Sequence, residues 1–181
     1  MATITTMKTL NNKIRFTKIR DVKSPKRNQG DAGSDFFVPE YSEEFAEVLR
    51  EKNKNNDIEI SDTNKTIIIG EHSQILIPSG IKVDIMDKLT YLDFENKSGI
   101  ATNKELLIGA QVIDAIYQGE VHINVHNVSN KLQVIEFGQK LAQAIHKEYR
   151  NTEWEEISNE EYDNIETSER GAGGFGSTGI K

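Results

Sequence analysis

An aspartate and a tyrosine stand three residues apart in the segment VIDAIYQGE, residues 112–120. Asp114 ends an apolar run, and Gly119 permits a tight hairpin shortly after Tyr117. A carboxylate in such a position could take a proton from water as a general base. The same pattern also fits an ordinary hairpin that holds a turn aspartate and a packed tyrosine, so the motif alone leaves both interpretations open.

A glycine-rich segment, RGAGGFGSTG, carries a different set of groups. Its first residue, Arg170, could pair with a phosphate, and Phe175 could stack on a base. The backbone amides around Gly176, Ser177 and Thr178 could approach an anion closely, whereas a flexible tail is the alternative. Ordering about ten residues costs on the order of 10 kcal/mol of backbone entropy, so we expect this segment to close as a lid only over a bound nucleotide.

Three further segments carry groups that suit phosphate or a metal ion. GDAGSDFF places Asp31 and Asp35 around a turn, where paired acids could hold a metal-bound water. ENKSGIA offers Lys97 followed by a hydroxyl and a glycine, which together suit a phosphate group. GQKLAQAIH puts the amide of Gln143 inside an apolar strand, where it needs a partner. Each segment, taken alone, also fits an ordinary turn or strand.

Composition limits the possible classes of function. The chain has 181 residues, a formal net charge of -7 and no cysteine, so no disulfide framework or thiolate nucleophile is available. The acidic balance argues against nonspecific binding to nucleic acid or to an anionic membrane, and an anionic ligand must be held locally by a few donors. The first residues lack the apolar core of a signal peptide, and no apolar run reaches membrane-spanning length. We therefore expect a single-domain cytoplasmic protein with neither nucleic acid nor membrane as its partner.

Short β-branched runs, separated by turn signals such as PSG and NKSG, predict an antiparallel barrel or sandwich. We expect strands at residues 13–19, 66–70, 73–78, 80–85, 90–95, 121–128, 132–137 and 141–147. Residues 41–56 differ and predict one surface helix. Phe45 and Leu49 have helical spacing there, and Ser42 could cap the helix. A second, short helix is expected at residues 158–165.

The order of these motifs resembles the five-motif series of the trimeric dUTPases. DAGSDFF resembles the first motif, NKSGIA the second, QVIDAIYQGE the third, GQKLAQ the fourth and RGAGGFGSTG the fifth. The resemblance extends from about residue 12 to residue 179. It implies an all-β, distorted jelly-roll or β-barrel subunit that assembles as a homotrimer, with a helical insertion near residues 41–57. Residues 1–168 would form the β domain, and residues 169–181 an arm that closes over a neighbouring subunit's site.

The same resemblance implies hydrolysis of dUTP to dUMP and pyrophosphate, with Mg²⁺ on the triphosphate. Asp114 would activate the water that attacks the α-phosphorus, and Tyr117 would pack against the sugar and exclude a 2′-hydroxyl. Asp35 would bind a water in the metal's shell. The remaining substrate-binding residues would read the edge of uracil, hold the phosphate chain and stack on the base. They are Lys97, Ser98, Gly99, Gln111, Val112, Ile113, Gln143, Arg170, Phe175, Gly176, Ser177 and Thr178.

Three features depart from the family pattern. Lys97 stands where the family usually has arginine, so an ammonium group replaces a guanidinium group that can form two parallel hydrogen bonds. Gln111 stands where glycine is usual and could reshape the base pocket. The segment 41–57 looks like an insertion that could hold a protein partner, so a nucleotide-responsive binding protein is one alternative function. A deaminase of the same superfamily, acting on dCTP, is the other.

Overall fold

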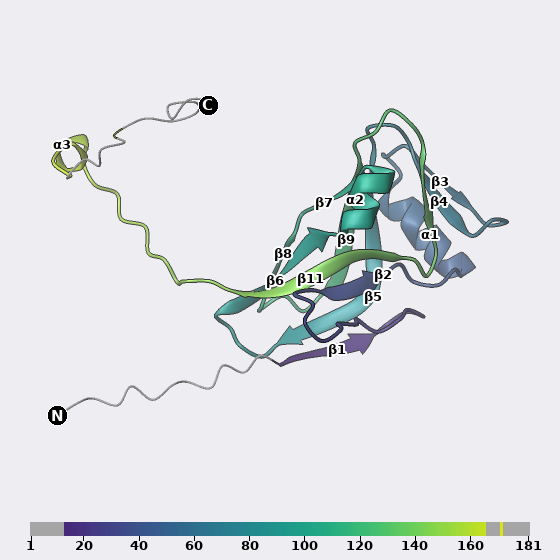
Figure 1. Ribbon diagram of the computed structural model, residues 1–181, viewed down its shortest axis with the longest axis horizontal. Helices are drawn as coiled ribbons and strands as arrows, with labels where there is room; N and C mark the ends of the chain where they lie inside the picture. Colours follow the sequence, from purple (N-terminus) through teal and green to yellow (C-terminus); the bar gives the residue numbers. More distant parts are fainter. Residues whose placement is uncertain (1–12, 166–170, 172–181) are drawn as a thin grey trace. The chain divides into compact units, whose positions relative to one another are not determined.

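The structure, a computed structural model, describes residues 13–165 and residue 171. The chain divides into two compact units, Met1–Arg150 and Asn151–Lys181. Strands predominate among the described residues of the first unit, where they form three sheets (Figure 1). The predicted all-β fold is therefore confirmed.

Two four-stranded sheets and one three-stranded sheet make up this unit. The first sheet has the order β1 (Ile14–Lys18), β5 (Gln74–Ile85), β9 (Glu120–Asn127) and β7 (Leu106–Gly109). The second has the order β2 (Ser34–Phe37), β11 (Lys140–Glu148), β6 (Thr90–Asn96) and β8 (Val112–Asp114). The third has the order β10 (Gln133–Glu136), β4 (Thr66–Ile69) and β3 (Ile58–Ser61). Neighbouring strands in all three sheets run antiparallel.

Alternation of apolar and polar residues sets the buried face of the strands. On β9, Val121, Ile123 and Val125 are fully buried, while the residues between them are partly exposed. In the second sheet, Phe36 and Phe94 pack edge to face with their ring centroids 4.8 Å apart. A slip of one residue would turn these side chains to the opposite face, so the apolar pattern fixes the strand register.

The long strand β5 differs from the prediction. Residues 73–78 and 80–85 were expected to form two strands separated by a turn, but they belong to one 12-residue strand. Gly80 does adopt a left-handed φ of +73°, as its sequence context suggests. The pairing with β9 nevertheless resumes at Lys82 after a register shift that begins at Pro78. The segment therefore forms a bulge and not a chain reversal.

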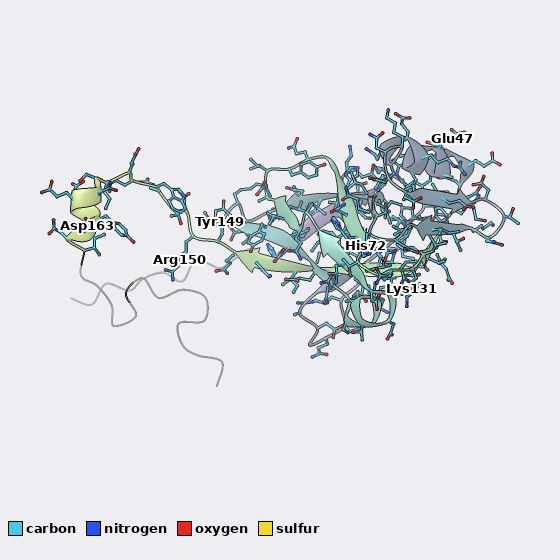
Figure 2. The ribbon with its side chains drawn as sticks, turned by 90° about the horizontal axis from the view of Figure 1, so that it is seen from above. Glu47, His72, Lys131, Tyr149, Arg150 and Asp163 are labelled. Carbon is cyan, nitrogen blue, oxygen red and sulfur yellow. The ribbon has the colours of Figure 1, made fainter. Side chains whose placement is uncertain are left out.

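The predicted helix in the insertion is confirmed as α1 (Glu43–Lys52), which lies beside β3 and β4 in Figure 1. The Ser42 hydroxyl caps it by accepting the amide of Phe45 at 3.1 Å. Phe45, Ala46 and Leu49 are buried in the core, whereas Glu47 points outward (Figure 2). The insertion is therefore part of the core on one face and charged on the other.

A buried amide fixes the end of α1 to the first sheet. Asn53 is 1% exposed, and its Nδ2 donates to the Leu76 carbonyl at 3.0 Å. Its Oδ1 accepts the Leu76 amide at 2.8 Å. These two bonds satisfy groups on β5 that would otherwise be buried without partners.

The helix α2 (Ser98–Lys104) occupies a segment that was predicted to be a turn. The amides of Ile100 and Ala101 both bond to the Lys97 carbonyl, at 3.0 and 2.9 Å, and begin a helical turn. The composition of NKSG does not distinguish a turn from the first turn of a helix. β3 and β7, of four residues each, were also not predicted.

In the second unit, the short helix expected at residues 158–165 is confirmed as α3 (Asn159–Asp163). Ser158 and Glu161 form a reciprocal capping box at its start. None of the helices in the described ranges combines the length and the apolar character needed to cross a membrane.

Candidate functional site

A buried carboxylate and two lysines form a cluster where β2, β11 and the end of β6 meet. Asp35 is 7% exposed. Its Oδ1 lies 2.7 Å from Lys97 Nζ, and its Oδ2 lies 2.6 Å from Lys140 Nζ. Burial raises the pKa of the Asp35 carboxyl, but hydrogen bonds from Lys140 and Lys97 outweigh burial, and the pKa lies below its ordinary value of 3.8. The carboxylate is therefore ionised at neutral pH.

Strand pairing places Gln143 beside this cluster. β11 sets Gln143 opposite Asp35 on β2 and opposite Glu95 on β6. Gln143 Nε2 donates to the Asn96 carbonyl at 2.9 Å. A Cβ at Gly33 would lie 2.8 Å from Gln143 Oε1, so glycine is needed there for the amide to keep its place. Residues of the first, second and fourth motifs thus converge within one chain.

A cavity of about 370 Å³ opens beside the two lysines. Its lining is formed by Lys97, Gly99, Ile100, Asn103, Lys104 and Lys140. Ser98 is exposed at the start of α2, next to this lining. Three ammonium groups make the cavity suitable for an anion such as phosphate. Lys140 was missed from the sequence, although its position in GQKLAQ, near Gln143, was an available signal.

The aspartate–tyrosine hairpin lies at the edge of the second sheet. β8 is the last strand of that sheet, and its Asp114 stands opposite Tyr91 on β6. Asp114 is exposed, and within the part of the chain that the structure describes no hydrogen bond or ion pair holds its carboxylate. The backbone amide of Tyr117 donates to the Asp114 carbonyl at 3.0 Å, and the Tyr117 hydroxyl donates to the Glu120 carbonyl at 2.9 Å. The tyrosine is thus held at two points, while 41% of it is exposed.

The residues before Asp114 offer a backbone edge. The Gln111 carbonyl accepts the Phe94 amide at 2.9 Å, which ties the start of β8 to β6. Val112 is 59% exposed, and Ile113 packs partly against the core. The other side of an edge strand presents amides and carbonyls that can bond to a ligand or another chain.

The lysine cluster and the hairpin do not meet within one chain. Tyr91, opposite Asp114, and Glu95, opposite Gln143, are four residues apart on β6. At a rise of roughly 3.3 Å per residue, this separation is about 13 Å along the sheet. The remaining predicted site residues lie outside the described residues. They are Arg170, Phe175, Gly176, Ser177 and Thr178.

Comparisons with known proteins were made with both sequence and structure. A sequence model of the family described as dUTPase matches residues 56–179. A Candida albicans deoxyuridine 5′-triphosphate nucleotidohydrolase is 41% identical over 111 residues, which cover 61% of this chain and 67% of that protein. The enzyme of the same name from Rickettsia massiliae is 30% identical over 142 residues, covering 77% of this chain and 91% of its own.

Solved structures share the fold at low sequence identity. A Staphylococcus bacteriophage 80alpha dUTPase with dUPNHPP superimposes with a TM-score of 0.70 at 20% identity, covering 93% of this chain and 99% of that one. The native EIAV dUTPase gives a TM-score of 0.57 at 20% identity, covering 81% of this chain and 98% of that one. The sequence matches extend over most of the chain, and the chain therefore belongs to the dUTPase family of hydrolases.

Proposed function

We propose that the protein hydrolyses dUTP to dUMP and pyrophosphate, in a site that copies of the chain complete together in a homotrimer. One observation carries this proposal. A cationic cluster suited to phosphates lies in one place, and the exposed Asp114 carboxylate beside a partly exposed tyrosine lies about 13 Å away along the sheet. This separation supports a site in which one chain supplies the lysine cluster and another supplies the carboxylate and the tyrosine.

The lysine cluster would hold the triphosphate. Lys97 and Lys140 carry the charge, and Ser98 and Gln143 add a hydroxyl and an amide as hydrogen-bond donors. Asp35 keeps the two ammonium groups in fixed positions, since each of its oxygens is bonded to one of them. Phosphoryl transfer leaves the protein mainly this task of positioning and charge stabilisation.

Magnesium fits this site as an ion that arrives with the substrate. The described residues contain no group of three or more His, Cys, Asp or Glu side chains that could hold a metal alone. Mg²⁺ in nucleotide sites commonly uses one or two carboxylates, several waters and the substrate's phosphates. The Asp35 carboxylate has lone pairs beyond its two lysine bonds and could accept a metal-bound water. When bound, Mg²⁺ would neutralise part of the triphosphate charge.

Asp114 would act as the general base. Its exposed carboxylate is available to take a proton from the water that attacks the α-phosphorus, a step worth roughly 10²–10⁴ in rate. Tyr117 would lie against the deoxyribose and leave no room for a 2′-hydroxyl. The backbone at Gln111, Val112 and Ile113 would bond to the edge of uracil, and cytosine would leave those groups unpaired.

The C-terminal arm, residues 169–181, would complete the site. Arg170 would pair with the γ-phosphate, and Phe175 would stack on uracil. The segment Gly176–Thr178 would add backbone and hydroxyl donors around the phosphate. The arm would reach the site of another copy, as the resemblance to the family's fifth motif implies.

The test measures pyrophosphate release from dUTP, dCTP, dTTP and UTP by the purified protein. We expect release from dUTP in preference to the other three nucleotides. The Asp114→Asn variant should lose turnover by roughly 10²–10⁴ while its affinity for a nonhydrolysable dUTP analogue changes little. Ammonia release from dCTP would instead support the deaminase, and near-normal turnover by Asp114→Asn would remove the catalytic role of that residue.

A further inference from the structure

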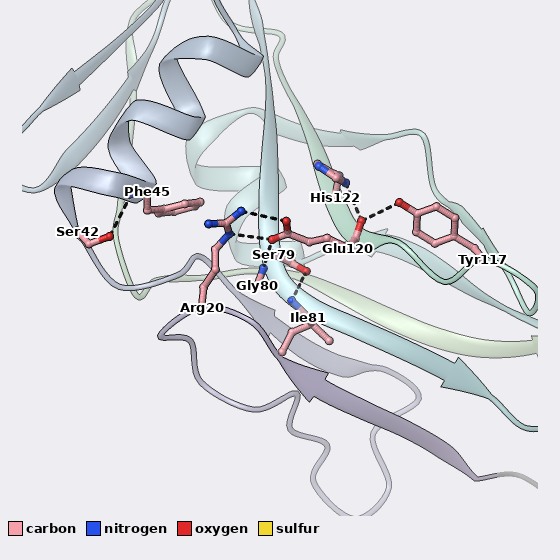
Figure 3. Close-up of polar contacts among 9 residues, drawn as sticks. All are labelled: Arg20, Ser42, Phe45, Ser79, Gly80, Ile81, Tyr117, Glu120 and His122. Carbon is pink, nitrogen blue, oxygen red and sulfur yellow. Dashed lines mark hydrogen bonds and ion pairs between the residues drawn. The ribbon is translucent and has the colours of Figure 1, made fainter.

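A continuous set of contacts joins the insertion helix to the tyrosine of the third motif (Figure 3). The Arg20 guanidinium carbon lies 5.2 Å from the centroid of the Phe45 ring on α1. The same guanidinium pairs with the Glu120 carboxylate, and the Glu120 carbonyl accepts the Tyr117 hydroxyl at 2.9 Å. Figure 3 shows these side chains in a line from α1 to the hairpin.

The ion pair in the middle of this line is well shielded and has a fixed geometry. Arg20 Nε lies 3.0 Å from Glu120 Oε1, and Arg20 Nη2 lies 3.1 Å from Glu120 Oε2. The two side chains are only 19% and 12% exposed. A two-bond guanidinium–carboxylate pair specifies orientation as well as contact, and shielding from water strengthens it.

The bulge in β5 supplies a third bond to the same carboxylate. The register shift between Pro78 and Lys82 releases the Gly80 amide from the ladder, and it donates to Glu120 Oε1 at 2.8 Å. A Cβ at Gly80 would lie 3.0 Å from Arg20 Cβ, so the bare glycine lets the arginine stem pack directly on β5. Glu120, the first residue of β9, is therefore fixed by β5 and by Arg20 together.

The position of the tyrosine follows from the position of Glu120. The Glu120 carbonyl receives the Tyr117 hydroxyl, and His122 Nδ1 lies 2.8 Å from the same oxygen. A Cβ at Gly119 would lie 2.3 Å from the Tyr117 hydroxyl, so the ring end lies directly against the backbone. A shift of the Glu120 backbone would move the far end of the ring with it.

We propose that Arg20 and Glu120 are positioning residues that hold Tyr117 at the distance from the sugar at which a 2′-hydroxyl is rejected. Phe45 of the insertion helix supports Arg20 from the other side. This inference rests on the proposed dUTP hydrolysis and assigns the insertion a part in selecting the sugar. Neither residue is among the proposed substrate-binding residues, and both would act through the bond from the tyrosine hydroxyl to the Glu120 carbonyl.

The experiment compares kcat/KM for dUTP and for UTP in the full-length protein. We expect Arg20→Met to lower the dUTP/UTP ratio about tenfold, the change expected for the loss of one well-placed hydrogen bond. The change should come mainly from faster use of UTP and a higher KM for dUTP, with kcat for dUTP little altered. Arg20→Lys keeps the positive charge but cannot form both hydrogen bonds to the Glu120 carboxylate, and should give an intermediate dUTP/UTP ratio.

Two further variants test the route of the effect. Tyr117→Phe removes the hydroxyl alone, and the double variant Arg20→Met/Tyr117→Phe should lower the ratio no further than Tyr117→Phe does. Residues that act through one bond are not additive, whereas independent residues are. The control is Arg50→Met, which removes a different arginine–carboxylate pair, the 2.8 Å contact between Arg50 on α1 and Asp62. It should leave the ratio unchanged.

Loss of Arg20 alone leaves the shielded Glu120 carboxylate without its cation, and this could unfold the protein. The variant Arg20→Met/Glu120→Gln removes both charges and carries the test in that event. An unchanged dUTP/UTP ratio in whichever of these variants is folded, or multiplicative effects in the double variant with Tyr117→Phe, would overturn the positioning role. A wild-type protein that does not hydrolyse dUTP would instead overturn the proposed function.

Discussion

Mixing two variants that each have little activity should restore activity if the site is shared between chains. The first variant is Asp114→Asn, which removes the general base. The second is Lys97→Met, which removes one cation of the phosphate cluster. Co-expression with two different affinity tags, followed by purification through both tags, yields oligomers that contain both kinds of chain. Pyrophosphate release from dUTP is then compared with that of each parent.

The expected recovery of activity depends on whether one chain can supply both residues, and the geometry of β6 bears on this. On β6, Asp114 lies opposite Tyr91 and Gln143 lies opposite Glu95. These two positions are four residues, or about 13 Å, apart along the strand. A general base works only within about 3 Å of the proton it takes, or through one water. If one chain supplies Asp114 and its neighbour supplies Lys97, about one site in three of each trimer that contains both kinds of chain has both residues intact.

The parents set a low background for this measurement. Asp114→Asn should retain roughly 0.01–1% of wild-type activity. Lys97→Met should retain roughly 1–10%, because a hydrogen bond to a charged group contributes about 1.5–3 kcal/mol. Recovery toward about a third of wild-type activity in the doubly tagged trimers is therefore distinguishable from either parent.

A second mixture serves as the matched control. Asp35→Asn and Lys97→Met alter residues that lie 2.7 Å apart in the same chain, so every mixed site keeps at least one lesion. We expect no recovery there. Doubly tagged oligomers of Asp114→Asn and Lys97→Met that stay at the level of the parents would refute the shared site, and so would a protein that is monomeric while it hydrolyses dUTP.

Further predictions concern stability. Leu49→Ala on α1 removes a fully buried side chain and should lower the free energy of unfolding in urea by roughly 2–5 kcal/mol, whereas Glu47→Ala on the outer face should change it by less than about 0.5 kcal/mol. Burial, helped by the charge of Lys52, lowers the pKa of His122 from 6.5, so the unfolded chain binds more protons below that pH. Stability should therefore fall as the pH drops below 6.5, and His122→Gln should weaken this dependence in melting experiments. The pKa of Asp35 in the folded protein lies below 3.8, so the carboxylate's contribution to stability is complete above pH 3.8 and is lost as the pH falls through the pKa of the folded state. Asp35→Asn should therefore weaken the fall of stability at acid pH.

The structure also affects how a partner at the insertion can be tested. Deleting residues 41–57 would remove Phe45, Ala46 and Leu49 from the core, so lost binding could reflect unfolding. Substitutions on the outer face of α1 avoid this problem. Glu43, Glu44 and Glu47 are exposed there and can be changed without disturbing the core.

Local signals in the sequence were sufficient for part of the fold. The helix α1 was predictable because its cap, its acidic first turn and its apolar spacing all lie within ten residues of one another. The course of β5 was not predictable in the same way. Gly80 has the left-handed backbone that its context suggests, but whether the chain then reverses depends on pairing with β9, some forty residues later.

In the candidate site, too, local sequence predicts some residues, whereas others depend on contacts between distant segments. Asp35, Lys97 and Gln143 were predictable from their motifs, because the motif order resembles a known family. Arg20 was not predictable, since its partner Glu120 is 100 residues away and the pair forms only when the β5 bulge brings the two together. No local pattern around Arg20 distinguishes it from an ordinary surface cation.

The exchange of arginine for lysine at position 97 has a structural counterpart in Lys140. A single arginine could supply two parallel bonds to phosphate, which Lys97 cannot do. Here a second ammonium group lies on the other oxygen of Asp35, so the cluster of Lys97, Lys140 and Asp35 keeps a net positive charge beside the cavity. Two point charges held by one carboxylate can meet two phosphate oxygens without the planar fork. In the proposed site, the second hydrogen bond that Lys97 cannot supply would come from Lys140, which strand pairing, and not local sequence, brings into place.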